Sequence, residues 1–208
     1  MASNTSSRSS IAKRRGLVRF SRHAPSLHEL RAVASRCTPK QFRELLARLQ
    51  TVIPYRKLAV SWGYYTNTTM RFVFNHGFPT EFLRWYLATG ALWKSVMFQE
   101  WLRTKRTLMW CDVARRLKAK FDPEMLKRVK EAGLQYSLCG GFTSRDYFVW
   151  FNAAMASEQS GRTHLKQFEF VVPSLVQASQ RVYPRTLLFC LFLEEQEVSA
   201  TIILLRYM

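Results

Sequence analysis

The chain of 208 residues is long enough to bury a sizeable core, and its 48% hydrophobic and 22% charged residues are typical of a globular protein. No run of about 18 apolar residues is present, so the sequence predicts no membrane-spanning helix. The 4 cysteines are far apart and do not cluster with the 4 histidines, which excludes a zinc-finger pattern or a disulfide framework and favours a reducing, cytoplasmic location.

The net charge of +18 is concentrated toward the N-terminus. Residues 1–57 carry 13 Lys and Arg against two Glu, whereas residues 145–208 carry six basic and six acidic residues. Positive charge attracts nucleic acid and other anionic surfaces, but phosphate contacts confer no sequence preference. We therefore expect weak, sequence-independent binding of nucleic acid by the basic residues between positions 8 and 22, which are Arg8, Lys13, Arg14, Arg15, Arg19 and Arg22.

The first predicted element follows a Ser-rich, basic arm over residues 1–25, which we expect to be disordered because it cannot bury an apolar face. Arg and Ser without acidic residues are also typical of organelle transit peptides. A helix is predicted to begin at Ser26, where Glu29 completes a capping box, and another at Thr38. The second helix presents apolar residues at helical spacing up to Pro54.

A β-hairpin is predicted next, because the apolar pattern changes to strict alternation in residues 58–65 and 70–75, on either side of the turn-like "TNT". A helix with Pro79 in its first turn should reach about Ala88, and a second helix should cover residues 94–104. A third, amphipathic helix is predicted in "DPEMLKRVKEAG", with its Asp as the N-cap and its final Gly at the C-terminal end.

The last predicted elements are a strand pair and a long helix. The segments "LQYSLCGGFTS" and "DYFVWFNAAMA" are apolar on both faces, which is typical of central strands. Residues 164–182 form a predicted helix in which Pro173 would introduce a kink or a break. The alternation of helices with two strand pairs predicts an α+β fold, an α-β-α sandwich with a central antiparallel sheet flanked by helices.

Aromatic residues are dense between positions 78 and 110. Phe78, Phe82 and Tyr86 recur at every fourth position and would form one stripe on a helix, and Trp93 begins a second stripe. Core packing accounts for any one of them, yet Trp and Tyr carry polar groups that need partners when buried. A mostly apolar cavity with a few fixed donors is typical of a small-molecule site, so we interpret this stretch as the lining of a pocket.

The spacing of this stretch resembles the autoinducer-binding domain of LuxR-type quorum-sensing regulators, and the similarity extends over about residues 27–184. Members typically combine a Tyr-Pro-x-x-Trp segment with a following Tyr, an Asp-Pro pair and a later Trp. The corresponding positions of this sequence hold Pro79, Phe82 in place of the first Trp, Tyr86, Ser95 in place of the Asp, and Trp110. Gly141 in "YSLCGGFT" matches a Gly of the family's Gly-Leu-x-x-Gly segment.

The resemblance implies a sensor domain, residues 26–186, that binds a small-molecule signal such as an acyl-homoserine lactone. The residues themselves predict no catalytic site, metal or cofactor. Trp110 would donate a hydrogen bond to a lactone carbonyl, and Tyr86 would donate one to the acyl amide carbonyl. Phe82, Trp93 and Gly141 belong to the same expected ligand-binding set, although Phe82 lacks the donor of a Trp.

Ser95 departs most from the family pattern, in which an Asp accepts the ligand amide N–H with a charged oxygen. A serine hydroxyl can accept the same bond only as a weaker, neutral partner. The pocket implied by the resemblance would therefore have a weakened preference for acyl-homoserine lactones. A solvated position on a helix is the other interpretation of Ser95.

Residues 187–208 are interpreted as a C-terminal remnant. The segment "LFLEEQEVS" is similar to the start of the family's DNA-binding helix-turn-helix, but the 18 residues after Cys190 are too few for two helices and a turn. We therefore expect a truncated or frameshifted regulator or a stand-alone sensor. Extra strands at "TLLFCLFL" and "SATIILLRYM" are the other interpretation.

Two functions of different classes are compatible with these patterns. The first is the signal-sensing domain of a LuxR-type regulator without its reader, whose expected partners are the signal and, in a homodimer, a second copy of the chain. The second is a basic protein that binds nucleic acid non-specifically through its N-terminal region, although aromatic residues for base stacking are sparse there. An enzyme is not expected, because no Gly-rich phosphate loop, metal cluster or Ser-His-Asp grouping is recognisable.

Overall fold

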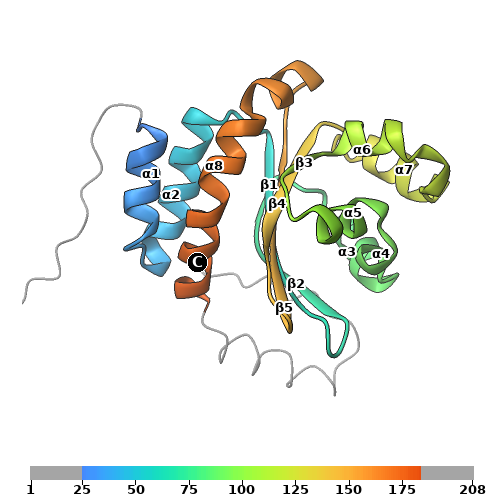
Figure 1. Cartoon of the computed structure of the whole chain (residues 1–208), viewed down its shortest axis with the longest axis horizontal. Coiled ribbons are helices and arrows are strands. Elements are labelled where there is room, and N and C mark those ends of the chain that lie inside the picture. Colours follow the sequence, from blue (N-terminus) through green and yellow to red (C-terminus); the bar gives the residue numbers. More distant parts are fainter. Residues whose placement is uncertain (1–24, 184–208) are drawn as a thin grey trace, which may run out of the picture.

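One antiparallel sheet is formed by β1 (Lys57–Tyr64), β2 (Thr69–His76), β3 (Leu108–Met109), β4 (Ser137–Thr143) and β5 (Tyr147–Ala154) (Figure 1). The computed structural model describes residues 25–183 and orders the strands β2-β1-β5-β4-β3. Both predicted strand pairs are therefore present, and β5 joins them because it pairs with β1 on one side and β4 on the other.

Helices cover both faces of the sheet, so the structure confirms the predicted α-β-α sandwich (Figure 1). One face is covered by α1 (Leu27–Ala34), α2 (Pro39–Val52) and α8 (Glu158–Val182). The other is covered by α3 (Thr80–Ala88), α4 (Ala91–Lys94), α5 (Val96–Thr104), α6 (Trp110–Arg116) and α7 (Pro123–Glu131), with the 3-10 helix η1 (Lys118–Lys120) between the last two. Within residues 25–183, no helix is long and apolar enough to cross a membrane. The basic residues between positions 8 and 22 and the segment 187–208 lie outside the described residues.

Capping residues determine where several helices begin and end. Ser26 caps α1, since its hydroxyl accepts a hydrogen bond from the Glu29 N–H at 3.2 Å and the Glu29 carboxylate accepts one from the Ser26 N–H at 2.7 Å. Asp122 caps α7 by accepting a hydrogen bond from the Glu124 N–H at 2.9 Å, and Gly133 follows the helix with a φ of 66°. These predicted boundaries are confirmed.

Two helices differ from the sequence-based prediction. The helix predicted over residues 94–104 is interrupted at Ser95, whose extended backbone ends α4 and begins α5. The closing helix begins earlier, where Ser157 accepts a hydrogen bond from the Ser160 N–H at 3.2 Å, and it continues through Pro173 without a break. Proline removes one helical hydrogen bond, and Pro173 lies on the exposed side of α8, where its ring meets no core side chain.

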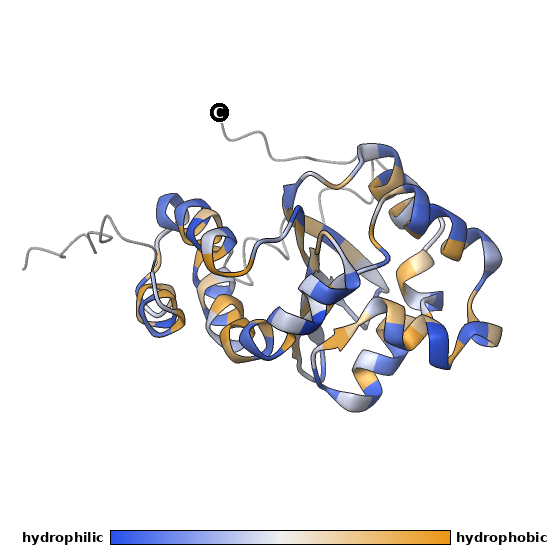
Figure 2. Cartoon of the chain, turned by 90° about the horizontal axis from the view of Figure 1, so that it is seen from above, coloured by the Kyte–Doolittle hydropathy of each residue, from blue (hydrophilic) through white to orange (hydrophobic). Residues whose placement is uncertain are grey.

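Strand alternation gives the two faces of the sheet different side chains. Leu58, Val60 and Trp62 of β1 are buried in the core that also contains apolar residues of α1, α2 and α8. The small residues Ala59 and Ser61 face the shorter helices instead. In Figure 2 the hydrophobic residues of the surrounding helices gather on the sides that face the sheet. The small residues of β1 leave room on the side of the shorter helices.

A β-bulge interrupts the regular pairing of β1 with β2. The register changes from Val60 opposite Phe74 to Ser61 opposite Phe72, so Val73 is the extra residue. The Tyr183 hydroxyl donates a hydrogen bond to the Val73 carbonyl at 3.0 Å, which ties the bulge to the end of α8. The bulge also keeps Phe72 on the same side of the sheet as Ser61, where both residues line a cavity.

Candidate functional site

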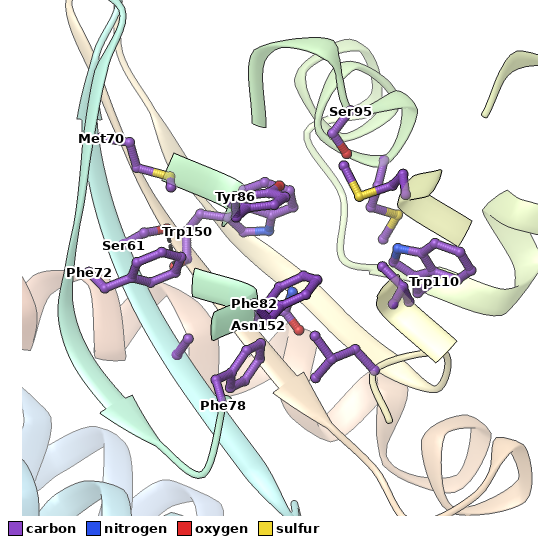
Figure 3. A pocket seen from close by; sticks show the side chains of 15 residues that line it. Ser61, Met70, Phe72, Phe78, Phe82, Tyr86, Ser95, Trp110, Trp150 and Asn152 are labelled. Atoms are coloured by element: carbon purple, nitrogen blue, oxygen red, sulfur yellow. Dashed lines mark hydrogen bonds between the residues drawn. The ribbon is translucent and has the colours of Figure 1, made fainter. Parts of the chain in front are cut away.

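The cavity lies between the sheet and the shorter helices (Figure 3). Strands β1, β2 and β5 form its floor, and α3, α5, α6 and α7 supply most of its walls. None of the 15 lining residues carries a formal charge, so the cavity is suited to a neutral, largely apolar molecule. The floor residues are Ala59, Ser61, Met70, Phe72, Trp150 and Asn152, and the wall residues are Phe78, Phe82, Tyr86, Ser95, Met97, Trp110, Met125, Val129 and Leu134.

Most of the cavity is filled by its own side chains. The free space left between them is only about 40 Å³. Sites for drug-sized ligands generally measure roughly 300–1,000 Å³. A ligand of that size would therefore displace side chains. Met70, Met97 and Met125 line the space and are suited to moving, because the unbranched thioether adapts readily to new neighbours.

The α3 wall of the cavity is a single aromatic stripe. Asn75 fixes the start of this segment, because its side chain accepts a hydrogen bond from the Phe78 N–H at 3.1 Å and donates one to the Phe78 carbonyl at 3.2 Å. The rings of Phe82 and Tyr86 are stacked, with centroids 5.6 Å apart and an interplanar angle of 22°. Spacing by four residues brings all three rings to the cavity.

Tyr86 of α3 and Ser95 at the start of α5 both line the cavity. Burial raises the pKa of Tyr86 well above its ordinary value, and the neighbouring Ser95 side chain opposes this shift to a smaller extent. Ser95 is only 5% exposed, and its hydroxyl accepts a hydrogen bond from the Phe98 N–H at 3.4 Å as the N-cap of α5. The interpretation of Ser95 as a solvated helix residue is therefore wrong, because Ser95 is a buried cap at the cavity wall.

Trp110 reaches the cavity from the start of α6, away from the α3 wall that carries Tyr86 (Figure 3). It is 9% exposed, and its ring packs against Phe121 with centroids 5.2 Å apart. The structure thus brings four residues of the expected ligand-binding set to one cavity: Phe82, Tyr86, Ser95 and Trp110.

Trp93 and Gly141, the other two residues of that set, lie outside the lining of this cavity. The Trp93 ring packs edge-on against Phe148, with centroids 5.7 Å apart. Gly141 is required by the close pairing of β4 with β5, because a Cβ at this position would lie 1.9 Å from the Val149 carbonyl oxygen. In this structure both positions serve packing around β5.

Trp150 and Asn152 line the floor of the cavity although the sequence motifs did not indicate them. They are two residues apart on β5 and therefore point to the same side of the sheet. The Trp150 ring stacks on Trp101 with centroids 5.8 Å apart and an interplanar angle of 4°. The Ser61 hydroxyl donates to the Trp150 carbonyl at 3.3 Å (Figure 3). The signal for both residues was the alternation in "YFVWFNAA", which places an amide on the same face as the indole.

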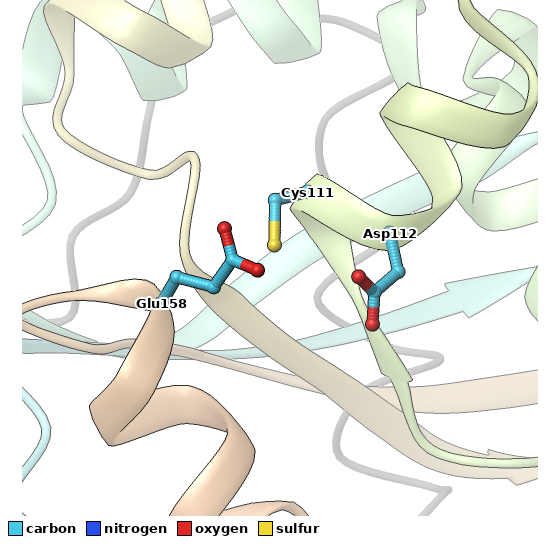
Figure 4. Close-up of side chains that lie close together, drawn as sticks. All are labelled: Cys111, Asp112 and Glu158. Carbon is cyan, nitrogen blue, oxygen red and sulfur yellow. The ribbon is translucent and has the colours of Figure 1, made fainter.

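A second polar cluster joins α6 to the start of α8 (Figure 4). The Cys111 thiol and the carboxylates of Asp112 and Glu158 lie within 4.8 Å of one another. Arg115 donates a hydrogen bond to Glu158 at 2.6 Å, and Arg162 donates one to Asp112 at 2.8 Å. Hydrogen bonds from Arg162 and then Arg115 lower the pKa of Glu158. Because both carboxylates are paired with arginines, the cluster is better suited to holding two helices together than to binding a cation.

Comparison with known proteins identifies the fold. No family model and no curated protein match the sequence. The structure of SdiA, a protein of Escherichia coli, in complex with octanoyl-rac-glycerol is similar, with a TM-score of 0.58 and 11% identity over 77% of this chain and 67% of that chain. The N-acylhomoserine lactone dependent LuxR family transcription factor CepR2 from Burkholderia cenocepacia has a TM-score of 0.56 and 14% identity over 77% of this chain and 94% of that chain.

The ligand-binding domain of VqsR from Pseudomonas aeruginosa is a third similar structure, with a TM-score of 0.55 and 10% identity over 74% of this chain and 94% of that chain. At such low identities the similarity concerns the fold. The chain therefore has the fold of these regulator domains, and the resemblance visible in the sequence is confirmed at that level.

Proposed function

We propose that this domain is a sensor that binds a neutral amphiphilic signal molecule, an acyl chain with an uncharged polar head, in the cavity between the sheet and the shorter helices. The observation that carries this proposal is the lining of the cavity, in which uncharged aromatic and aliphatic side chains alternate with hydroxyl, indole and amide groups. Such walls accept an acyl chain, and the few polar groups orient its head. An ionised head is disfavoured, because burying a charge without a partner is costly.

The similar structures support a signal of this class. One of them holds octanoyl-glycerol, and another is described as dependent on N-acylhomoserine lactone. Both compounds are neutral and carry an acyl chain, which suits the uncharged cavity of this chain. Ser95 offers a neutral hydroxyl where the family pattern has a carboxylate. We therefore propose that binding by this domain depends less on an amide N–H than binding by a typical acyl-homoserine lactone sensor.

Ligand titration tests the proposal. The purified chain is titrated with 1-octanoyl-glycerol, N-octanoyl-homoserine lactone and octanoate while tryptophan fluorescence and Tm are recorded. For the two neutral ligands we expect saturable fluorescence changes. At a concentration of 100 times the Kd, they should stabilise the fold by about 2.7 kcal/mol, which raises Tm by roughly 5–10 °C. For octanoate we expect neither effect, because its head is charged at neutral pH.

A cavity-filling variant tests whether the ligand binds inside the cavity. Ala59→Leu adds three carbon atoms to the floor of the cavity, where Ala59 is 2% exposed. Ala119→Leu makes the same change at an exposed position and is the matched control. Only the first variant should lose binding, and a cooperative melting transition without ligand shows that it has folded. Equal binding of octanoate, or full binding by the Ala59→Leu variant, would contradict the proposal.

Weak binding of nucleic acid is a second candidate function, and the charge distribution favours it. Six basic residues without an acidic one occur from Arg8 to Arg22. Each neutralised phosphate steepens the log–log dependence of affinity on salt concentration by about 0.9. We expect deletion of residues 8–22 to flatten this slope for DNA duplexes of unrelated sequence. An unchanged slope, or a strong preference for one DNA sequence, would exclude this function for the arm.

A further inference from the structure

We propose that the indole N–H of Trp150 and the side-chain oxygen of Asn152 hold the polar head of the ligand, and that this head combines a carbonyl group with a nearby hydroxyl or amide N–H. The inference rests on the proposed function. It specifies which residues recognise the polar head of the ligand and which chemical groups this head must carry.

Two polar atoms on the cavity floor carry this inference. Within the described part of the chain, Trp150 Nε1 and Asn152 Oδ1 are buried and have no hydrogen-bond partner. Trp150 is 5% exposed, and both side chains rise from β5 into the lining of the cavity (Figure 3). Folded proteins seldom bury a donor or an acceptor without a partner, because the lost bonds to water are not replaced. A molecule bound in the cavity would supply partners for both atoms at once.

Two hydroxyl groups of the same cavity are already engaged. Ser61 donates to the Trp150 carbonyl at 3.3 Å, and Ser95 accepts from the Phe98 N–H at 3.4 Å as the N-cap of α5. A ligand that competes for these hydroxyl groups breaks bonds within the protein. Trp150 and Asn152 gain a bond without losing one, so the head is directed to β5 rather than to the start of α5.

The two groups have complementary chemical requirements. An indole N–H can only donate, so it pairs with a carbonyl oxygen, whereas an amide oxygen can only accept, so it pairs with an O–H or N–H. Residues two apart on a strand are separated by roughly 6–7 Å. The carbonyl and the donor must therefore belong to one head group. Monoacylglycerols and N-acyl amides both carry this pair on an acyl chain, while a simple methyl ester carries only the carbonyl.

The Trp150 donor is held in place by its neighbours. Its ring stacks on Trp101 at an interplanar angle of 4° and lies 4.9 Å from the Phe98 ring, measured between centroids. Its strand, β5, is paired on both sides, with β1 and with β4. A group fixed in this way loses little freedom when a ligand binds, which favours selectivity at this point of the cavity.

Comparison of ligands with and without a donor tests the inference. The ligands are 1-octanoyl-glycerol, N-octanoyl-homoserine lactone and methyl octanoate. In the native chain we expect the first two to bind about five- to tenfold more tightly than methyl octanoate, which is the effect of one neutral hydrogen bond. Asn152→Leu should abolish this preference by weakening only the first two. Trp150→Phe keeps an aromatic ring but removes the N–H, so it should weaken all three to a similar extent.

The stability of the unligated protein gives a second readout. Asn152→Leu replaces an unpaired polar group by an apolar group of similar size, so we expect an unchanged or higher Tm. A lower Tm would show that Asn152 supports the fold, which contradicts the inference. Ser179→Ala is the control, because this buried hydroxyl on α8 already donates to the Val176 carbonyl at 2.9 Å and lies outside the cavity lining, and it should leave the ratio of the three affinities unchanged.

The outcomes separate the inference from the proposed function. If Ala59→Leu loses binding while Asn152→Leu keeps the preference for donor-bearing ligands, the cavity binds the ligand but the assignment of its head to β5 is wrong. If no neutral ligand binds the native chain, the proposed function fails and the inference fails with it. The ratio of the affinity for 1-octanoyl-glycerol to the affinity for N-octanoyl-homoserine lactone shows whether Asn152 accepts a hydrogen bond better from a hydroxyl or from an amide N–H.

Discussion

The two faces of the sheet are packed in different ways. One face is covered mainly by two long helices, α2 with 14 residues and α8 with 25 residues. Large side chains fill this layer completely, since Trp62 of β1 and Phe168 of α8 are both 0% exposed. On the other face, the five helices have four to nine residues each, and half-buried rings such as Phe82 and Tyr86 line the cavity beside the fully buried Phe98 and Trp101. Short segments joined by turns can move individually, whereas a long helix buries one continuous stripe. One layer is therefore suited to stabilising the domain, and the other to changing shape around a bound molecule.

The largest expected effect is on the free energy of unfolding, and it is measured by replacing one Phe with Ala on each face of the sheet. Phe168→Ala removes a fully buried ring from α8 and should cost about 3–5 kcal/mol of the free energy of unfolding. Phe82→Ala removes a half-buried ring from the cavity wall, where part of the ring already faces open space, and should cost roughly 1–2 kcal/mol. Urea denaturation measures both values. Equal losses would mean that the two faces are packed alike.

Ser95→Asp should sharpen the comparison by adding a charged acceptor to the adaptable face. Asp is as good an N-cap as Ser, so α5 should keep its start. The carboxylate gives an amide N–H a second place to bind, and we expect the affinity for N-octanoyl-homoserine lactone to rise by up to about tenfold, less if desolvation of the carboxylate opposes it. Methyl octanoate is the control in the same titration. A rise for both ligands would show that residue 95 does not contact the amide.

Trp110→Phe should have a smaller effect, limited to one ligand class. The variant keeps an aromatic ring against Phe121 and removes only the indole N–H. If Trp110 donates to a lactone carbonyl, as the family resemblance implies, the affinity for the lactone should fall by about fivefold while that for 1-octanoyl-glycerol is unchanged. Isothermal titration with both ligands distinguishes the two cases. An equal loss would point to packing rather than to hydrogen bonding.

The smallest effect is expected at the polar cluster that connects the two layers. Arg162 and Arg115 lower the pKa of Glu158 in the folded state, so this carboxylate contributes stability above its unfolded pKa, about 4.3, and the contribution is lost as the pH falls through the folded pKa. Glu158→Gln should therefore lower the urea midpoint slightly at pH 7 and not at pH 2. Ligand affinity should stay the same. A loss of stability that is independent of pH would indicate packing.

Local patterns in the sequence are sufficient to predict most helices and strands of the fold. The capping box at Ser26, the alternation along β1 and the position of Gly133 each depend on neighbours within a few residues, and all three are confirmed. The break at Ser95 was missed because apolar residues keep helical spacing across it. The early start of α8 has a signal in the sequence, because Ser157 is a good N-cap and directly precedes the helix.

The site could be predicted only in part. Phe82, Tyr86 and Trp110 were found through spacing and resemblance, since they follow one another closely along the chain. The roles of Trp150 and Asn152 depend on which polar atoms lack partners after folding, and no local pattern contains that information. The same holds for the contact of Cys111 and Asp112 with Glu158, which come together only because α6 and α8 both contact the edge strand β3.

The strand order has a consequence for the synthesis of the protein. β5 is made last among the five strands, yet it lies between β1 and β4. At a translation rate of about 5–20 residues per second, the β1–β2 hairpin waits roughly 4–16 s for this neighbour, with the edge of β1 open to other chains. The cavity also lacks its floor until β5 arrives. A nascent chain is therefore unable to respond to a signal until almost the whole domain has left the ribosome.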